Sequence, residues 1–159
     1  MGHVLDRDAL LQTLRALRRD APDLRIAMAN GLFDLLHVGH LRYLEAARAE
    51  ADRLVVAVND DESAHALRGA GKPIVPGVER AELLAGFACV DFVVLFPELD
   101  VGPLLRAVRP DVHCKGTDYD PDTLPEAGIA RDLGIRIAIV GDPKDHATTD
   151  LISRVRDGR

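Results

Sequence analysis

The chain has 159 residues, of which 47% are hydrophobic, 4% aromatic and 29% charged, and its formal net charge is −6. This composition is typical of one globular domain with an aliphatic core and excludes a disordered chain. An acidic chain also lacks the basic surface that nucleic acids require, so nucleic acid is not an expected partner. We expect no membrane span, because no apolar run approaches the ~20 residues that one needs. Cys89 and Cys114 lack a C-x-x-C spacing and the N-terminus does not resemble a signal peptide, which favours a cytoplasmic location.

Helical and strand patterns alternate from one end of the chain to the other. Apolar residues at helical spacing predict a first helix over 5–17, and short apolar runs rich in valine predict buried strands. This alternation indicates the α/β class: one doubly wound, Rossmann-like domain over 1–159 with a five-stranded, mostly parallel sheet. Residues 1–20 hold the N-terminal helix and 25–155 the catalytic core. The expected strands are 25–30, 53–59, 91–96, 111–115 and 135–140, and the later helices 38–49, 63–67, 78–87, 101–108, 125–133 and 148–156.

Ligands of doubly wound sheets bind beyond the carboxyl ends of the strands. The segments to search are therefore 30–40, 59–61, 115–119 and the turn before 148. No G-x-G-x-x-G follows the first predicted strand. The run from Gly69 to Lys72 has the wrong spacing for a P-loop, and Pro73 stands where a P-loop has Ser or Thr.

The run His37-Val-Gly-His40 lies at the first turn of a predicted helix. Residues three apart share a helix face, and the N–H groups at a helix start attract anions. Gly39 has no side chain, which lets a ligand approach the backbone closely. Two imidazoles beside it would suit a phosphate that gains charge in a transition state. Two other interpretations stay open. One histidine could cap the helix while the other packs in the core, or the pair could bind zinc, although no third ligand is evident.

The segment from Gly31 to His40 has the form G-x-F-D-x-x-H-x-G-H and resembles the signature of the cytidylyltransferase-like nucleotidyltransferases. Other segments of that family are similar in the same order, over about residues 25 to 155. They are Val56-Ala-Val-Asn-Asp-Asp61, Glu79-Arg80, Val90-Asp-Phe-Val-Val94, Lys115-Gly-Thr-Asp-Tyr119 and Thr148-Thr-Asp-Leu-Ile152.

Within the family, the chain most resembles the heptose 1-phosphate adenylyltransferases in their stand-alone form. Cytidylyltransferases of the family have R-T-E-G-I-S before the last helix, whereas this chain has Asp145-His-Ala-Thr-Thr149. The resemblance implies transfer of AMP from ATP to a sugar 1-phosphate, such as D-glycero-β-D-manno-heptose 1-phosphate, with release of pyrophosphate. A cytidylyltransferase for glycerol 3-phosphate and an FMN adenylyltransferase are the alternatives within the family. A non-catalytic nucleotide-binding module and a zinc-dependent hydrolase are alternatives outside it.

The resemblance also implies roles for individual residues. His37, His40 and Lys115 are the expected catalytic residues, because they would neutralise the phosphates during transfer. Mg²⁺ is the expected cofactor, carried mainly by the phosphates of ATP, and the family leads us to expect a homodimer. Arg80 could instead be a surface charge, and Asp61, Thr148 and Thr149 could simply cap helices. The expected nucleotide ligands are Asn30, Gly31, Phe33, Gly39, Thr148 and Thr149, and the expected ligands of the acceptor or its phosphate are Asp34, Asp61, Lys72, Arg80 and Asp118.

Overall fold

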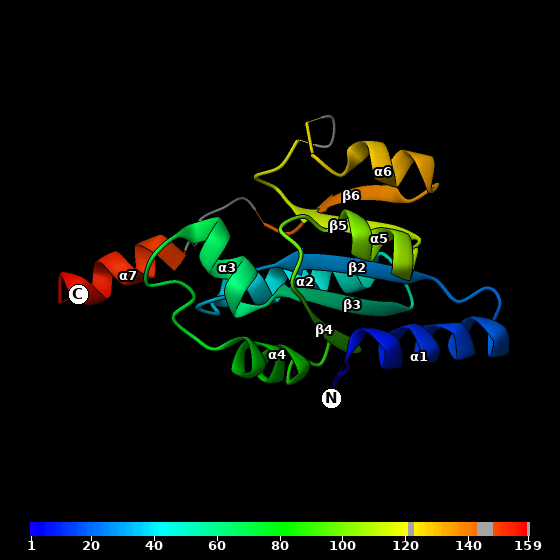
Figure 1. The fold of residues 1–159 in the computed structure, drawn as a ribbon, viewed down its shortest axis with the longest axis horizontal. Coiled ribbons are helices and arrows are strands. Elements are labelled where there is room, and N and C mark those ends of the chain that lie inside the picture. Colours follow the sequence, from blue (N-terminus) through cyan, green and yellow to red (C-terminus); the bar gives the residue numbers. More distant parts are fainter. Residues whose placement is uncertain (121–122, 143–147, 159) are drawn as a thin grey trace.

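The fold is a three-layer α/β/α arrangement around one sheet, seen in a computed structural model (Figure 1). The structure describes residues 1–120, 123–142 and 148–158, without the side chains of 148–151. No helix in these ranges has the length and apolar character needed to cross a membrane.

The sheet has six strands in the order β1-β4-β3-β2-β5-β6, and every neighbouring pair is parallel. The chain builds one side of the sheet outward from β2 through β3 to β4, and then returns to the other side of β2 to form β5 and β6. The direction of winding therefore reverses between β2 and β5, and this point is where such sheets bind ligands. The strands are β1 (His3–Val4), β2 (Ile26–Gly31), β3 (Arg53–Asn59), β4 (Phe92–Phe96), β5 (Val112–Gly116) and β6 (Arg136–Val140).

Helices cover both faces of the sheet, so the central strands are buried on both sides, as their unbroken apolar runs predict. One face packs against α1, α5 and α6, and the other against α2 and α4. The two resulting aliphatic cores are separate clusters on opposite faces. The helices are α1 (Arg7–Asp20), α2 (Val38–Ala49), α3 (Asp61–Arg68), α4 (Gly77–Ala85), α5 (Gly102–Val108), α6 (Ala127–Asp132) and α7 (Thr148–Arg156).

The doubly wound fold is confirmed, and the strand count differs by one. The additional strand, β1, is only two exposed residues long, so it has no apolar run to signal it. It exists because its backbone pairs with β4, where His3 lies opposite Phe92. The first helix begins at Arg7 because the Asp6 carboxylate accepts a hydrogen bond from the N–H of Ala9 at 2.8 Å, which fixes the helix start.

Candidate active site

The first helix turn after β2 is capped by its own two histidines. His37 is the N-cap of α2, and its Nδ1 accepts a hydrogen bond from the N–H of Gly39 at 3.2 Å. Nδ1 of His40 in turn accepts from the N–H of His37 at 3.3 Å. The two rings are in contact at a tilt, with centroids 3.9 Å apart and planes inclined by 33°. This reciprocal arrangement is a capping box in which both side chains are imidazoles.

The capping contacts fix which nitrogen of each ring carries the proton. A nitrogen that accepts a hydrogen bond has its lone pair available, so in a neutral ring the proton is on the other nitrogen. Both His37 and His40 accept at Nδ1, which assigns the N–H to Nε2 in both rings. The backbone therefore gives the site two N–H donors close together, at a helix end that already favours anions. Helix capping and ligand binding are compatible here, because they use different nitrogens.

Phe33 packs against His40, one of the two histidines. Its φ is +50°, a left-handed conformation that is uncommon outside glycine and is accommodated in this loop. The ring is buried and meets the ring of His40 edge to face, with centroids 5.4 Å apart. A Cβ on Gly31 would lie 3.2 Å from the Phe33 ring, so the loop packs tightly where glycine stands. The contacts of Gly31 and Phe33 are thus with the loop itself, which holds His40 in place.

Lys115 lies at the point where the winding of the sheet reverses. It belongs to β5, and its Nζ donates to Oδ1 of Asn30, near the end of β2, at 3.3 Å. The ammonium also lies 4.3 Å from the centroid of the Tyr119 ring, within the range of a cation–π contact. The residue is only 6% exposed. The structure therefore brings together Asn30 and Lys115, which come from distant parts of the sequence.

The Lys115 ammonium has a buried counter-charge that the sequence did not reveal. Oε1 of Glu126 lies 3.1 Å from Nζ of Lys115 and 3.0 Å from Nε2 of His113. Burial raises the pKa of the Glu126 carboxyl, but the hydrogen bond from His113 and the charge of Lys115 outweigh it and lower the pKa to about 2. Glu126 is thus a carboxylate at neutral pH. The contact depends on the conformation of the loop from β5 to α6. No sequence pattern fixes that conformation, so the sequence gives no signal of the contact.

Asp34 ties the signature loop to the loop before α4. Its Oδ1 accepts from the N–H groups of Ile74 at 2.7 Å and Val75 at 2.9 Å, and its Oδ2 pairs with Nζ of Lys72 at 3.2 Å. Burial raises the pKa of Asp34, but the hydrogen bonds from Val75, Lys72 and Ile74 and the charge of Lys72 lower it overall. Two expected ligands of the acceptor phosphate are therefore partners of each other in this structure.

Arg80 differs most from expectation, because it is fully buried. Its guanidinium donates to the carbonyls of Val75 and Asn59, both at 2.9 Å, to the carbonyl of Leu32, and to Asp61 Oδ1 at 2.8 Å. Four of the five N–H donors of an arginine are thus used within the protein. The expectation of a surface charge is therefore wrong: Arg80 braces the loop after β2, the end of β3 and the loop before α4 at the carboxyl edge of the sheet. Its contact with a phosphate stays a prediction.

Asp61 takes part in the same brace and does not cap α3. Its Oδ1 accepts from the N–H of Gly77 at 2.7 Å as well as from Arg80. The cap of α3 is Asp60, whose carboxylate accepts from the N–H of Ser63 at 2.8 Å. The expected capping of α3 is therefore wrong, and Asp61 instead fixes the start of α4 through Oδ1. Its contact with substrate stays a prediction.

Three other expected residues contribute less to the described geometry. Thr148 and Thr149 do begin α7, but their side chains lie outside the described residues. Asp118 lies in the turn after β5, where a Cβ on Gly116 would come within 2.8 Å of its Oδ1. The contact of Thr148 and Thr149 with phosphate and the contact of Asp118 with the acceptor stay predictions.

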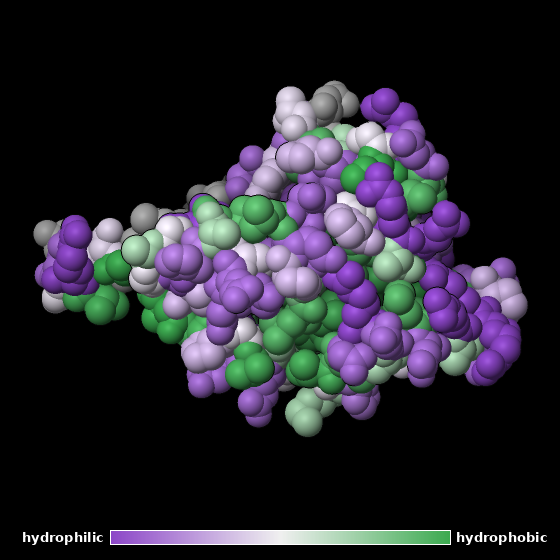
Figure 2. Space-filling view, in the orientation of Figure 1, coloured by the Kyte–Doolittle hydropathy of each residue, from purple (hydrophilic) through white to green (hydrophobic). Residues whose placement is uncertain are grey.

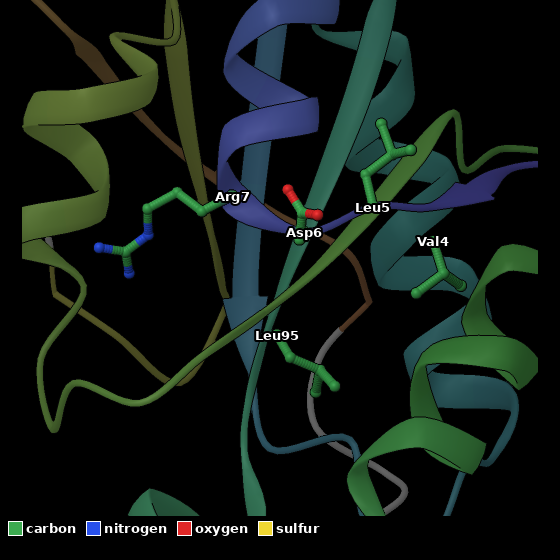
Figure 3. A pocket seen from close by; sticks show the side chains of 5 residues that line it. All are labelled: Val4, Leu5, Asp6, Arg7 and Leu95. Carbon is green, nitrogen blue, oxygen red and sulfur yellow. The ribbon is translucent and has the colours of Figure 1, made fainter.

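A small hollow elsewhere on the surface has no comparable chemistry. It lies between the N-terminal strand and β4, lined by Val4, Leu5, Asp6, Arg7 and Leu95 (Figure 3). Figure 2 shows apolar side chains on this face between α1 and α4. The two charged groups of the hollow are occupied, since Asp6 caps α1 and Arg7 pairs with Glu98 at 2.7 Å. Within the part of the chain that the structure describes, no group of three or more His, Cys, Asp and Glu could hold a metal.

The model of the family named Cytidylyltransferase-like matches residues 28–148, which span β2, the signature loop, Lys115 and the start of α7. The chain belongs to this family. The matched region contains the histidine pair, most of β2 and all of β5, the two strands at the winding reversal. The residues that meet at the carboxyl edge of the sheet therefore belong to the part of the chain that the family shares. The cytidylyltransferase-like chain is thereby a nucleotidyltransferase in class.

Curated relatives of this cytidylyltransferase-like chain include proteins named Bifunctional protein HldE. The one from Desulfatibacillum aliphaticivorans is 41% identical over 94% of this chain and 30% of its own length. The one from Pseudomonas entomophila (strain L48) is 44% identical over 82% of this chain and 28% of its own length. The chain thus spans less than a third of these relatives. A crystal structure of the lipopolysaccharide core biosynthesis protein from Thermoplasma volcanium GSS1 is also similar, with a TM-score of 0.64, 29% identity, and coverage of 76% of this chain and 99% of that one.

Proposed function

We propose that the chain transfers AMP from ATP to a sugar 1-phosphate, with D-glycero-β-D-manno-heptose 1-phosphate as the acceptor. The observation that carries the proposal is the pair of imidazoles at the start of α2, each held by the backbone at Nδ1. The sugar acceptor is supported by the resemblance of the signature segments to heptose 1-phosphate adenylyltransferases and by identities of 41% and 44% to two HldE proteins. The lack of R-T-E-G-I-S before α7 favours ATP over CTP.

In the proposed reaction, an oxygen of the acceptor phosphate attacks the α-phosphorus of ATP. A new P–O bond forms, the bond from the α-phosphorus to the oxygen that bridges to the β-phosphate breaks, and pyrophosphate leaves with that electron pair. A phosphate monoester with a second pKa of ~6 is already largely ionised near neutral pH, so the attack needs no general base. The work of the protein is to align two anions and to neutralise their charge.

The side chains of the site meet this need with donors. His37 and His40 donate from Nε2 to oxygens of the α- and β-phosphates, where charge increases during transfer. Lys115 supplies an ammonium donor at the neighbouring strand end, 3.3 Å from Asn30. Lys72 offers a second ammonium, which an acceptor phosphate reaches by taking the place of Asp34 as its partner.

Mg²⁺ enters the proposal as part of the nucleotide. The described residues include no group of three or more acidic, histidine or cysteine side chains suited to a metal, and both oxygens of Asp34 already accept from donors. We propose that the phosphate oxygens of ATP hold the metal, because these are ligands that Mg²⁺ prefers. No role in the proposed transfer is assigned to a metal bound by the protein.

A screen of pyrophosphate release tests the proposal directly. ATP, CTP and GTP are each combined with heptose 1-phosphate, glycerol 3-phosphate and FMN, with Mg²⁺ present. We expect release with ATP and heptose 1-phosphate. Release with CTP alone would overturn the choice of nucleotide, release with FMN or glycerol 3-phosphate alone would overturn the acceptor, and no release from any pair would overturn the transferase. ¹⁵N NMR of the histidine rings tests the site separately, because the proposal requires Nδ1 of His37 and His40 to be unprotonated.

A further inference from the structure

Three ionisable side chains form a buried row behind the proposed phosphate site. His113 and Lys115 are two residues apart on β5, so their side chains leave the same face of the sheet. Glu126, the residue before α6, places Oε1 between them, at 3.0 Å from Nε2 of His113 and 3.1 Å from Nζ of Lys115. The exposed fractions are 0% for His113, 6% for Lys115 and 7% for Glu126. One carboxylate oxygen thus joins the buried histidine to the ammonium at the carboxyl edge of the sheet.

The position of the Lys115 ammonium depends on these neighbours. A lysine side chain has four rotatable methylenes and a strongly hydrated charge, so burying it requires a partner. Glu126 supplies the only acidic partner that the structure gives Lys115 within the described residues, while Asn30 and the ring of Tyr119 contact the ammonium from other directions. Together they hold Nζ at the strand end before any phosphate binds, which lowers the entropy lost on binding.

His113 has one polar contact in the described structure, and that contact is with Glu126. Nε2 of His113 meets Oε1 of the carboxylate, whereas the buried Nδ1 has no hydrogen-bond partner among the described groups. A proton on Nδ1 would be an unpaired buried donor, so the ring proton belongs on Nε2, where it donates to the carboxylate. The one polar contact of this buried histidine therefore helps to fix the position of the Glu126 carboxylate.

We propose that Glu126 and His113 are positioning residues for Lys115: Glu126 holds the ammonium in place at the end of β5, and His113 holds Glu126. The proposal rests on the proposed function, because it takes Lys115 as the group that contacts nucleotide or acceptor phosphate. It makes a clear distinction between residues. Lys115 contacts the substrate, whereas Glu126 and His113 act only through Lys115.

A double-mutant cycle on Glu126 and Lys115 tests this dependence. Glu126→Gln keeps an oxygen for His113 but removes the counter-charge, and we expect kcat/KM for ATP to fall roughly 10- to 100-fold, the range for losing a hydrogen bond to a charged group. In a Lys115→Met background the same change is expected to alter kcat/KM by less than about twofold, because its target is gone. Losses that multiply in the double variant would overturn the proposal, since a merely structural effect does not depend on Lys115.

Variants of His113 provide a second test with a conservative rescue. His113→Gln keeps an N–H donor near the position of Nε2 and is expected to retain most of kcat/KM, whereas His113→Leu removes the donor and is expected to lower it about tenfold. Equal losses in the two variants would overturn the role of His113. Glu50→Gln is the matched control, because it breaks the ion pair of Glu50 with Arg136 and leaves Lys115 untouched. The control is expected to keep kcat/KM within twofold.

Isothermal titration of the same variants with ATP separates this proposal from the proposed function. If the wild-type chain releases no pyrophosphate with any acceptor, the proposed function fails, but the cycle on ATP affinity still decides the positioning role. Weaker binding of ATP in Glu126→Gln that disappears in the Lys115→Met background supports the proposal. Unchanged ATP affinity in Glu126→Gln, together with unchanged kcat/KM, overturns it.

Discussion

Replacing Arg80 by methionine is expected to destabilise the fold far more than it affects ATP binding. Methionine keeps much of the length and apolar volume of arginine but none of its donors. Three carbonyls, those of Leu32, Asn59 and Val75, lose the guanidinium at once. Each buried acceptor left without a partner costs about 1–3 kcal/mol, whereas the Asp61 carboxylate can be solvated because its side chain is 55% exposed. Because the contacts of Arg80 with Leu32 and Val75 are only part-buried, we expect a loss of about 3–5 kcal/mol.

Urea denaturation followed by far-UV circular dichroism measures this loss as a shift of the midpoint at constant slope. Arg136→Ala is the control, since Arg136 makes a half-exposed ion pair with Glu50 and should cost no more than about 1 kcal/mol. Arg80→Lys keeps the charge and some donors, and is expected to lie between the two. The structural role of Arg80 would be refuted if Arg80→Met lowered the free energy of unfolding by less than about 1 kcal/mol and weakened ATP binding tenfold. That result would favour Arg80 as a phosphate ligand.

Three further predictions concern the rest of the site. His40→Ala removes a transition-state donor and is expected to lower kcat by roughly 10²–10³, measured by pyrophosphate release, while near-normal turnover would contradict its role. The pKa of Glu126 is lowered in the fold from 4.5 to about 2, so its contribution to stability is complete above pH 4.5 and is lost as the pH falls to about 2. The stability difference between wild type and Glu126→Gln should therefore shrink over that range in acid denaturation, and a constant difference would argue against the lowered pKa. Asp34→Ala should speed amide exchange at Ile74 and Val75, seen by hydrogen-exchange mass spectrometry, whereas Asp34→Asn retains an acceptor and should change it less.

The order and type of the main elements could be predicted because they follow from local patterns. The helix Val38–Ala49 and the strand Arg53–Asn59 have the bounds that their apolar spacing predicted. The strand β1 could not be found in this way, because two exposed residues become a strand only through pairing with β4. Local pattern describes a segment, whereas strand pairing depends on a partner far away in sequence.

The same distinction applies to the site. His37 and His40 were recognisable because they stand three positions apart at the predicted start of one helix, where the side chains of the N-cap and N3 positions meet. The burial of Arg80 was not recognisable, because its carbonyl acceptors come from three segments, two loops and the end of β3, that meet only in the fold. Glu126 was missed for a similar reason: it reaches Lys115 across a loop whose conformation no motif specifies. Contacts within one element are visible in sequence, and contacts between loops are not.

The parallel pairing of β1 with β4 has a practical consequence for experiments on this chain. His3 lies opposite Phe92, the first residue of β4, so the N-terminal residues lie at the amino end of the sheet. The histidine pair and Lys115 lie at the carboxyl end, on the far side of the core. A fluorophore or a surface tether attached at Met1, which is fully exposed, leaves the approach to the site open. Single-molecule or surface-based binding measurements can therefore be made through an attachment at this residue.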